Sequence, residues 1–226
     1  MIASFDATET VLALCLTGIS LVCLYDRHLV RACCFFVAFA LTMTTAWWHF
    51  GASWLAVVEF LLGALMTGLS LFYALGLFLP RGASPLIRDT FVDVWPRKVA
   101  RVFLVLGWLV MLGAVIRFAI PGLFNAPLEQ PLLLAGIMMI ASGLGAFALH
   151  RHLVRRLLAF NILGSGVFMV LVGVAGPTAT AQALISVGLC IAWLGSMLAA
   201  LLIQQLVYLA GADSMRGDGD LGERAR

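Results

Sequence analysis

The sequence predicts an all-α, polytopic membrane protein with about seven transmembrane helices. Of its 226 residues, 63% are hydrophobic and only 11% are charged, whereas soluble domains carry about 25% charged residues. The apolar residues also gather in separate segments of helix length, each of a size to cross a bilayer. These segments cover roughly residues 9–25, 29–50, 53–79, 99–117, 131–149, 154–175 and 180–209.

The basic residues predict how these segments are oriented. All but one of the fourteen Lys and Arg residues lie in or beside the loops after the first, third and fifth segments, or in the C-terminal tail. The exception is Arg117. Because Lys and Arg accumulate in cytoplasmic loops, we expect the N-terminus outside and the C-terminus in the cytoplasm. This pattern needs an odd number of spans, which favours seven.

Tryptophans mark the loop between the second and third segments. Trp47, Trp48 and Trp54 surround it, and such residues are enriched where a membrane meets water. We therefore expect them in the aromatic belt of the outer leaflet.

The third segment carries Glu59. Of the eleven acidic residues in the sequence, it is the only one in the interior of a predicted span. A carboxylate at the bilayer centre costs about 2.5–3.5 kcal/mol, so it must face protein or water. Gly63, Thr67 and Ser70 follow it at spacings of three or four and continue one face of the helix. Desolvation favours the neutral form of a carboxyl group. Glu59 is therefore a candidate proton relay, the alternative being a hydrogen-bonded structural acid.

The loop after the third segment divides the chain into units. Its stretch SPLIRDTFVDVW has an apolar and a charged face, which indicates a short helix on the membrane surface. We expect a three-helix unit over 1–80, this surface helix and a fourth span over 81–127, and a second three-helix unit over 128–210. The charged tail, 211–226, is expected to be disordered.

The second unit holds polar and small residues inside its spans. Asn161 and Ser165 lie four residues apart on one face of the sixth segment. Asn161 can hold water, or it can bond a neighbouring helix, as intramembrane amides commonly do. In the seventh segment, Gly188 and Gly195 belong to a stripe of small residues that predicts close helix packing.

No pattern in the chain predicts a cofactor, a metal site or a nucleic-acid partner. The five cysteines lack CxxC spacing and lie in or beside apolar segments. Nucleotide-binding and hydrolase motifs are absent from the sequence. The net charge of +3 is spread over loops. We expect a protein that is not an enzyme by itself.

The first unit resembles a known membrane module. YDRHLVRA, followed by ASWLAVVEFLLGALMTGLSLFYAL, resembles the D-type subunit of membrane-bound hydrogenases, the C-terminal region of the A subunit of Mrp-type sodium/proton antiporters, and part of the J subunit of complex I. That family reads APDVALTEAAVGAGL at this place. Ala52, Ala56, Glu59 and Gly63 match it, whereas Ser53 and Trp54 replace its Pro and Asp.

The second unit resembles a neighbouring module of the same complexes. GLGAFALHRHLVRRLLAFNILGSGVFMVLVG and TATAQALISVGLCIAW are similar to the C subunit of Mrp antiporters and the K subunit of complex I. The K subunit has intramembrane glutamates where Asn161 and Gly195 stand here. Their absence resembles the C branch.

Together the two resemblances imply an accessory membrane subunit of a multisubunit Mrp-like Na⁺/H⁺ antiporter, or of a related complex-I-type ion-translocating complex, in the bacterial cytoplasmic membrane. They imply large antiporter-like subunits as partners, with H⁺ and Na⁺ as the transported ions and Glu59 as one protonatable station. Two alternatives remain open: a membrane-arm subunit of a redox-driven hydrogenase or quinone oxidoreductase, and a stand-alone carrier of a small solute.

Overall fold

The structure, a computed structural model, describes residues 7–77, 130–150 and 152–223, with single positions between 99 and 118. In α9 the side chains are described up to Leu209. Every regular element in these parts of the chain is a helix. The helices are α1 (Ala7–Tyr25), α2 (Leu29–His49), α3 (Ser53–Val58), η1 (Glu59–Thr67), α4 (Gly68–Ala74), α7 (Pro131–Leu149), α8 (Leu153–Ala175) and α9 (Ala179–Glu223).

Six helices of the described residues are long and apolar enough to cross a membrane. One of them is built from α3, η1 and α4 joined end to end, over Ser53–Ala74, and another is the first part of α9, Ala179–Leu209. All six coincide with predicted segments, which confirms the all-α prediction for these residues. The predicted surface helix lies outside the described residues. Of the predicted fourth span, 99–117, the described positions are helical, and the rest lies outside.

The last helix is longer than its apolar segment. It continues to Glu223, through residues 211–223 of the 211–226 tail for which we expected disorder.

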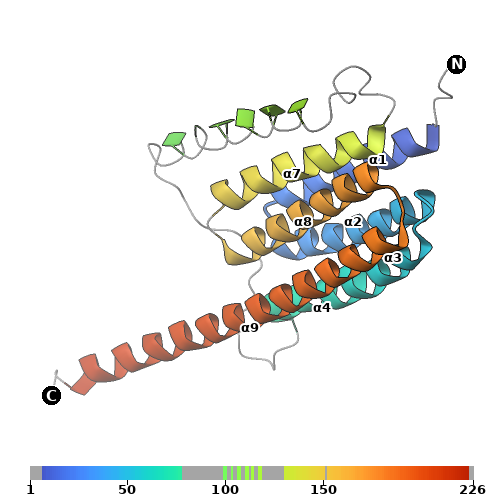
Figure 1. The fold of residues 1–226 in the computed structure, drawn as a ribbon. Coiled ribbons are helices and arrows are strands. Elements are labelled where there is room, and N and C mark those ends of the chain that lie inside the picture. Colours follow the sequence, from blue (N-terminus) through green and yellow to red (C-terminus); the bar gives the residue numbers. More distant parts are fainter. Residues whose placement is uncertain are drawn as a thin grey trace, which may run out of the picture.

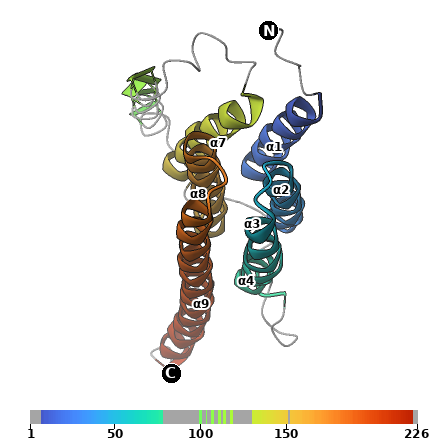
Figure 2. The same ribbon diagram turned by 45° about the vertical axis from the view of Figure 1, so that its right-hand side comes forward.

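The helices form two layers, one from each half of the chain (Figure 2). α1, α2 and the α3–η1–α4 span make one layer, and α7, α8 and α9 make the other. Across the interface α1 packs on α7, α2 on α8, and the α3–η1–α4 span on α9. Facing helices run in the same direction (Figure 1). The interface between the layers is therefore where side chains from the two halves meet.

Tight turns connect neighbouring helices of a layer. Gly51, between α2 and α3, has a φ of 76°, and Gly176, between α8 and α9, has a φ of 73°. Only glycine adopts this left-handed conformation without strain. Both turns end a helix at a reversal of the chain, where such glycines are common.

Glycines also bring α7 and α8 close together. A Cβ added at Gly166 would lie 2.7 Å from the carbonyl oxygen of Gly136, and one at Gly143 would lie 3.0 Å from the backbone nitrogen of Leu163. Small residues allow such backbone contact between membrane helices. The two helices consequently form the most extensive helix pair of the described bundle.

Two long side chains of the second layer bind the ends of helices in the first. Arg155, buried at the start of α8, donates a hydrogen bond of 3.0 Å to the carbonyl of Leu24 and another to the carbonyl of Asp26. Gln204 of α9 donates to the carbonyls of Tyr73 and Ala74, at 2.7 and 3.0 Å. The last carbonyls of a helix have no partner within it. Both side chains thus satisfy helix ends and join the layers.

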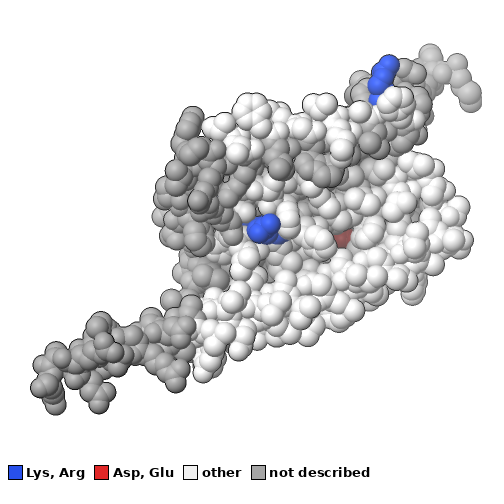
Figure 3. Space-filling view, turned by 60° about the vertical axis from the view of Figure 1, so that its left-hand side comes forward, with Lys and Arg blue, Asp and Glu red and all other residues white. Residues whose placement is uncertain are grey.

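The outer surface is apolar. In the view of Figure 3, uncharged residues cover nearly all of the described face, and Lys and Arg side chains appear only in isolated places. Large hydrophobic side chains are exposed along every described span. Such a surface suits a lipid environment.

Candidate functional site

Glu59 is buried where the two layers meet. It is the first residue of η1 and only 2% of its surface is exposed. The indole N–H of Trp47, from α2, donates a hydrogen bond of 3.4 Å to its Oε2. Trp47 itself is fully buried. The side chain of Glu59 is therefore surrounded by protein in this structure.

The helix that carries Glu59 is wound as a π-helix from Glu59 to Thr67. In this form the backbone N–H bonds the carbonyl five residues earlier instead of four. The hydroxyl of Thr67 follows the same register and donates a bond of 2.7 Å to the carbonyl of Leu62, five residues back. π-Helical turns are rare and frequently lie at functional sites.

Gly63 provides the space that the Glu59 side chain occupies. A Cβ at this position would overlap Oε1 of Glu59 and would lie 2.9 Å from its Cδ. The carboxyl group thus lies directly over Gly63. Any larger residue would push it away.

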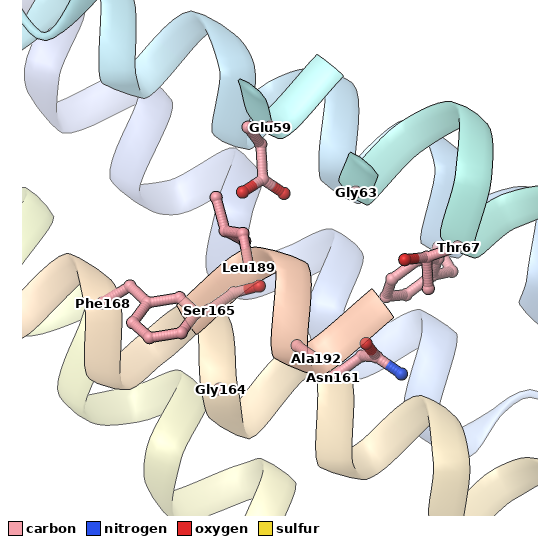
Figure 4. Close-up of a pocket in the computed structure, with 10 residues that line it drawn as sticks. Glu59, Gly63, Thr67, Asn161, Gly164, Ser165, Phe168, Leu189 and Ala192 are labelled. Atoms are coloured by element: carbon pink, nitrogen blue, oxygen red, sulfur yellow. The ribbon is translucent and has the colours of Figure 1, made fainter. Parts of the chain in front are cut away.

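A small cavity lies beside this carboxyl group, between the layers (Figure 4). Its volume of about 20 Å³ gives room for about one water molecule. Residues of α2, η1, α8 and α9 enclose it: Phe36, Glu59, Gly63, Thr67, Asn161, Gly164, Ser165, Phe168, Leu189 and Ala192. Polar residues that the sequence predicts separately in the two halves therefore meet in one place.

Two oxygen atoms at the cavity have no hydrogen-bond partner among the described residues. These are Oε1 of Glu59 and the hydroxyl of Ser165, which is itself buried. Neither is completely enclosed by protein atoms. One comes from each layer, so the cavity presents an acceptor and a hydroxyl to whatever occupies it.

Asn161 serves mainly to join α8 to α9. Its amide nitrogen donates to the hydroxyl of Ser196 and to the carbonyl of Leu157, both at 2.9 Å. The Ser196 hydroxyl, fully buried, lies 3.1 Å from the amide oxygen and 2.9 Å from the carbonyl of Ala192. A bond to a neighbouring helix is one of the two predicted roles of Asn161. Ser196 was not predicted.

The other predicted polar and packing residues lie away from the cavity or behave differently. Ser70 bonds the carbonyl of Met66 at 2.9 Å and lines a different pocket, between α4 and α9. A Cβ at Gly188 would lie 2.7 Å from the ring of Phe168, as close packing of α8 and α9 requires. Gly195 is exposed, and nothing lies within 4 Å of a Cβ placed there. The packing expected at Gly195 is therefore absent among the described residues.

The three tryptophans beside the turn between α2 and α3 differ in exposure. Trp48 and Trp54 are 68% and 61% exposed, as residues of a membrane-interface belt would be. Trp47 points inward to Glu59, so its expected place in the belt is corrected. Adjacent residues on a helix point in directions about 100° apart, and the sequence does not say which of two neighbouring tryptophans faces the bundle.

No protein-family model, curated protein or solved structure matches the chain. The fold and the site nevertheless define a class. This is a multi-pass helical membrane protein with a carboxyl group buried beside a water-sized cavity between two helical layers. Within the described residues no three His, Cys, Asp or Glu side chains cluster as a metal site.

Proposed function

We propose that this chain is an accessory membrane subunit of a multisubunit Mrp-like cation/proton antiporter, or of a related complex-I-type ion-translocating complex, in the bacterial cytoplasmic membrane. The observation that carries this proposal is the position of Glu59. Its carboxyl group is 2% exposed and borders a cavity shared by the two halves of the chain. These are the halves that resemble neighbouring modules of such complexes.

Glu59 would serve as a protonatable station. Burial favours its neutral form, and the N–H of Trp47 offers limited stabilisation to the charged form. A carboxyl group with access to both forms can take up a proton and release it. Intramembrane acids that face the interior of a helical bundle or a water-filled cavity often mark proton relays.

The chain would need other subunits to complete a path. Among the residues of the described spans, Glu59 is the only Asp, Glu or Lys that lies away from a helix end. One carboxyl group cannot carry a proton through the whole thickness of a bilayer. The remaining relay groups, and the second ion, Na⁺, would be handled by large antiporter-like partners.

The topology that fits this role has seven spans, the N-terminus outside and the C-terminus in the cytoplasm. The basic residues Arg27, Arg155 and Arg156 lie together with Arg31 at one end of the described spans, the end proposed to be cytoplasmic. Residues 99–117 would form the seventh span.

Cation/proton exchange by the assembled complex in inverted membrane vesicles tests the role of Glu59. Glu59→Gln keeps the size of the side chain and removes its exchangeable acid proton. We expect assembly to be unchanged and exchange to fall to background. Ser70→Ala is the matched control, since Ser70 lies in the same span outside the cavity. Full exchange by an assembled Glu59→Gln complex would contradict the relay.

Purification of the intact complex in mild detergent tests the class of assembly. Large antiporter-like membrane subunits without soluble redox subunits support the antiporter. Iron–sulfur or nickel subunits in the same complex would instead support the alternative, a membrane arm of a redox-driven enzyme. The cavity at Glu59, about 20 Å³, is far smaller than the roughly 300–1,000 Å³ of small-molecule sites. This size disfavours a stand-alone solute carrier at this site.

A further inference from the structure

The two carboxyl oxygens of Glu59 have different surroundings. Trp47 donates its indole N–H to Oε2. Oε1 lies over Gly63 at the edge of the cavity and has no hydrogen-bond partner among the described residues. The carboxyl group therefore has one oxygen held by the first layer and one oxygen open to the space between the layers.

The chemistry of an indole decides where the acid proton sits. An indole N–H can only donate a hydrogen bond, never accept one. The carbonyl oxygen of a neutral acid is a stronger acceptor than its hydroxyl oxygen. A donor at one oxygen therefore favours the tautomer with the hydroxyl on the other oxygen. With Trp47 on Oε2, the proton is placed on Oε1.

We propose that Trp47 is a positioning residue that directs the exchangeable proton of Glu59 to Oε1, the oxygen at the inter-layer cavity. This inference rests on the proposed role of Glu59 as a protonatable station. When Glu59 releases its proton, the O–H bond at Oε1 breaks and a water molecule in the cavity accepts the proton. The carboxylate that remains keeps its hydrogen bond from Trp47. On return, the proton comes back to the same oxygen.

This geometry makes proton exchange one-sided. Phe36 of α2, Gly63 and Thr67 of η1, and residues of α8 and α9 surround the cavity, so a proton on Oε1 meets the second layer. A proton on Oε2 would meet Trp47, which has no lone pair to receive it. Trp47 would thus act on the direction of transfer through Glu59 without taking part in it.

Infrared spectroscopy of the purified complex tests the proposal directly. The C=O band of protonated Glu59 is identified as the band that Glu59→Gln removes. Trp47→Phe keeps an aromatic ring and removes the N–H, so the band is expected to shift to higher wavenumber. Exchange should fall roughly tenfold, the effect of one lost hydrogen bond. Trp48→Phe is the matched control, because Trp48 is the exposed neighbour and should change neither quantity.

A Glu59 band that stays in place in Trp47→Phe would overturn the proposal, whatever happens to transport. If Trp47→Phe does not accumulate, the complex is labelled with ¹⁵N at the indole nitrogens of its tryptophans. One of the six tryptophan signals of this chain must then move in Glu59→Ala, which removes the acceptor oxygen, and no movement would also overturn it. Should Glu59→Gln exchange normally while the band still shifts in Trp47→Phe, the relay fails and the contact between Trp47 and Glu59 stands.

Discussion

The carboxyl group of Glu59 occupies the volume that a side chain at Gly63 would fill. A Cβ on Gly63 would overlap Oε1 and lie 2.9 Å from Cδ. The two residues lie four apart in a π-helix, so this contact is made within one span and does not depend on a neighbouring helix. The glycine is therefore a determinant of where the acid points.

Gly63→Ala is expected to displace the carboxyl group from the cavity. The new methyl group cannot be accommodated while Oε1 keeps its place, and the displaced acid would lose its alignment with Trp47. We expect cation/proton exchange by the complex to fall at least tenfold while the chain still inserts. The rate of exchange in membrane vesicles, normalised to the amount of assembled complex, measures this.

Gly164→Ala provides the control for that experiment. Gly164 lines the same cavity, but nothing lies within 4 Å of a Cβ placed there. We expect a much smaller effect than at Gly63. Equal losses in the two variants would mean that the cavity volume, and not the position of the carboxyl group, matters.

The Asn161–Ser196 hydrogen bond is expected to stabilise the contact between α8 and α9. Hydrogen bonds between membrane helices contribute about 0.6 kcal/mol on average and up to about 1.7 kcal/mol. Ser196→Ala and Asn161→Ala should each lower the free energy of unfolding by about this amount. In a double-mutant cycle the second substitution should cost less once the first is present. Unfolding in mixed detergent micelles measures these energies, and fully additive effects would contradict the pairing.

Much of the site could be predicted from the sequence because its signals are local. A lone acid in an apolar span marks Glu59, and the spacing of four places Gly63 and Thr67 on its face, where the structure has them. The same reasoning places Asn161 and Ser165 together on α8. Ser70 lies further along the same span and lines a separate pocket against α9, because spacing gives the face of a helix and not how far a cavity extends along it.

The contacts between helices could not be predicted from the same signals. Trp47 and Trp48 are adjacent residues of the same type, so the sequence does not distinguish them. Only the packing of α2 decides that Trp47 contacts Glu59. Ser196 is one of several hydroxyl residues in the last span, and its role depends on Asn161, 35 positions away. Pairings of this kind depend on which helix faces lie opposite each other, and periodicity does not encode that.

Acid is expected to weaken the turn between α1 and α2 through Asp26. The guanidinium of Arg31, which donates to both carboxylate oxygens at 2.5 and 2.9 Å, and the backbone N–H of His28 hold the pKa of Asp26 below its usual value of 3.8. A carboxyl whose pKa is lower in the folded state stabilises that state above its unfolded pKa, about 3.9. This contribution is lost as the pH falls through the folded pKa.

Asp26→Asn should therefore remove part of the loss of stability below pH about 4 and leave the slope between pH 5 and 7, roughly, unchanged. The effect should be small, because the Arg31 side chain is open to solvent, which screens its interaction with Asp26. Thermal unfolding in detergent across this pH range checks it. A pH dependence identical in the two proteins would show that Asp26 contributes nothing to it.

Arg155 should matter more to stability than its neighbour Arg156. Arg155 is 3% exposed and donates to the carbonyls of Leu24 and Asp26, whereas Arg156 is exposed and lies over the ring of Phe147 at 4.6 Å. Hydrogen bonds from a charged donor contribute about 1.5–3 kcal/mol, and a surface cation–π contact about 0.5–1 kcal/mol. Arg155→Ala should accordingly cost about 2–4 kcal/mol of unfolding free energy, because the end of α1 loses its partner in the second layer. Arg156→Ala should cost less than about 1 kcal/mol. Detergent unfolding of both variants measures the difference, and protease cleavage at the turn between α1 and α2, faster in Arg155→Ala alone, shows whether the loss arises at that helix end.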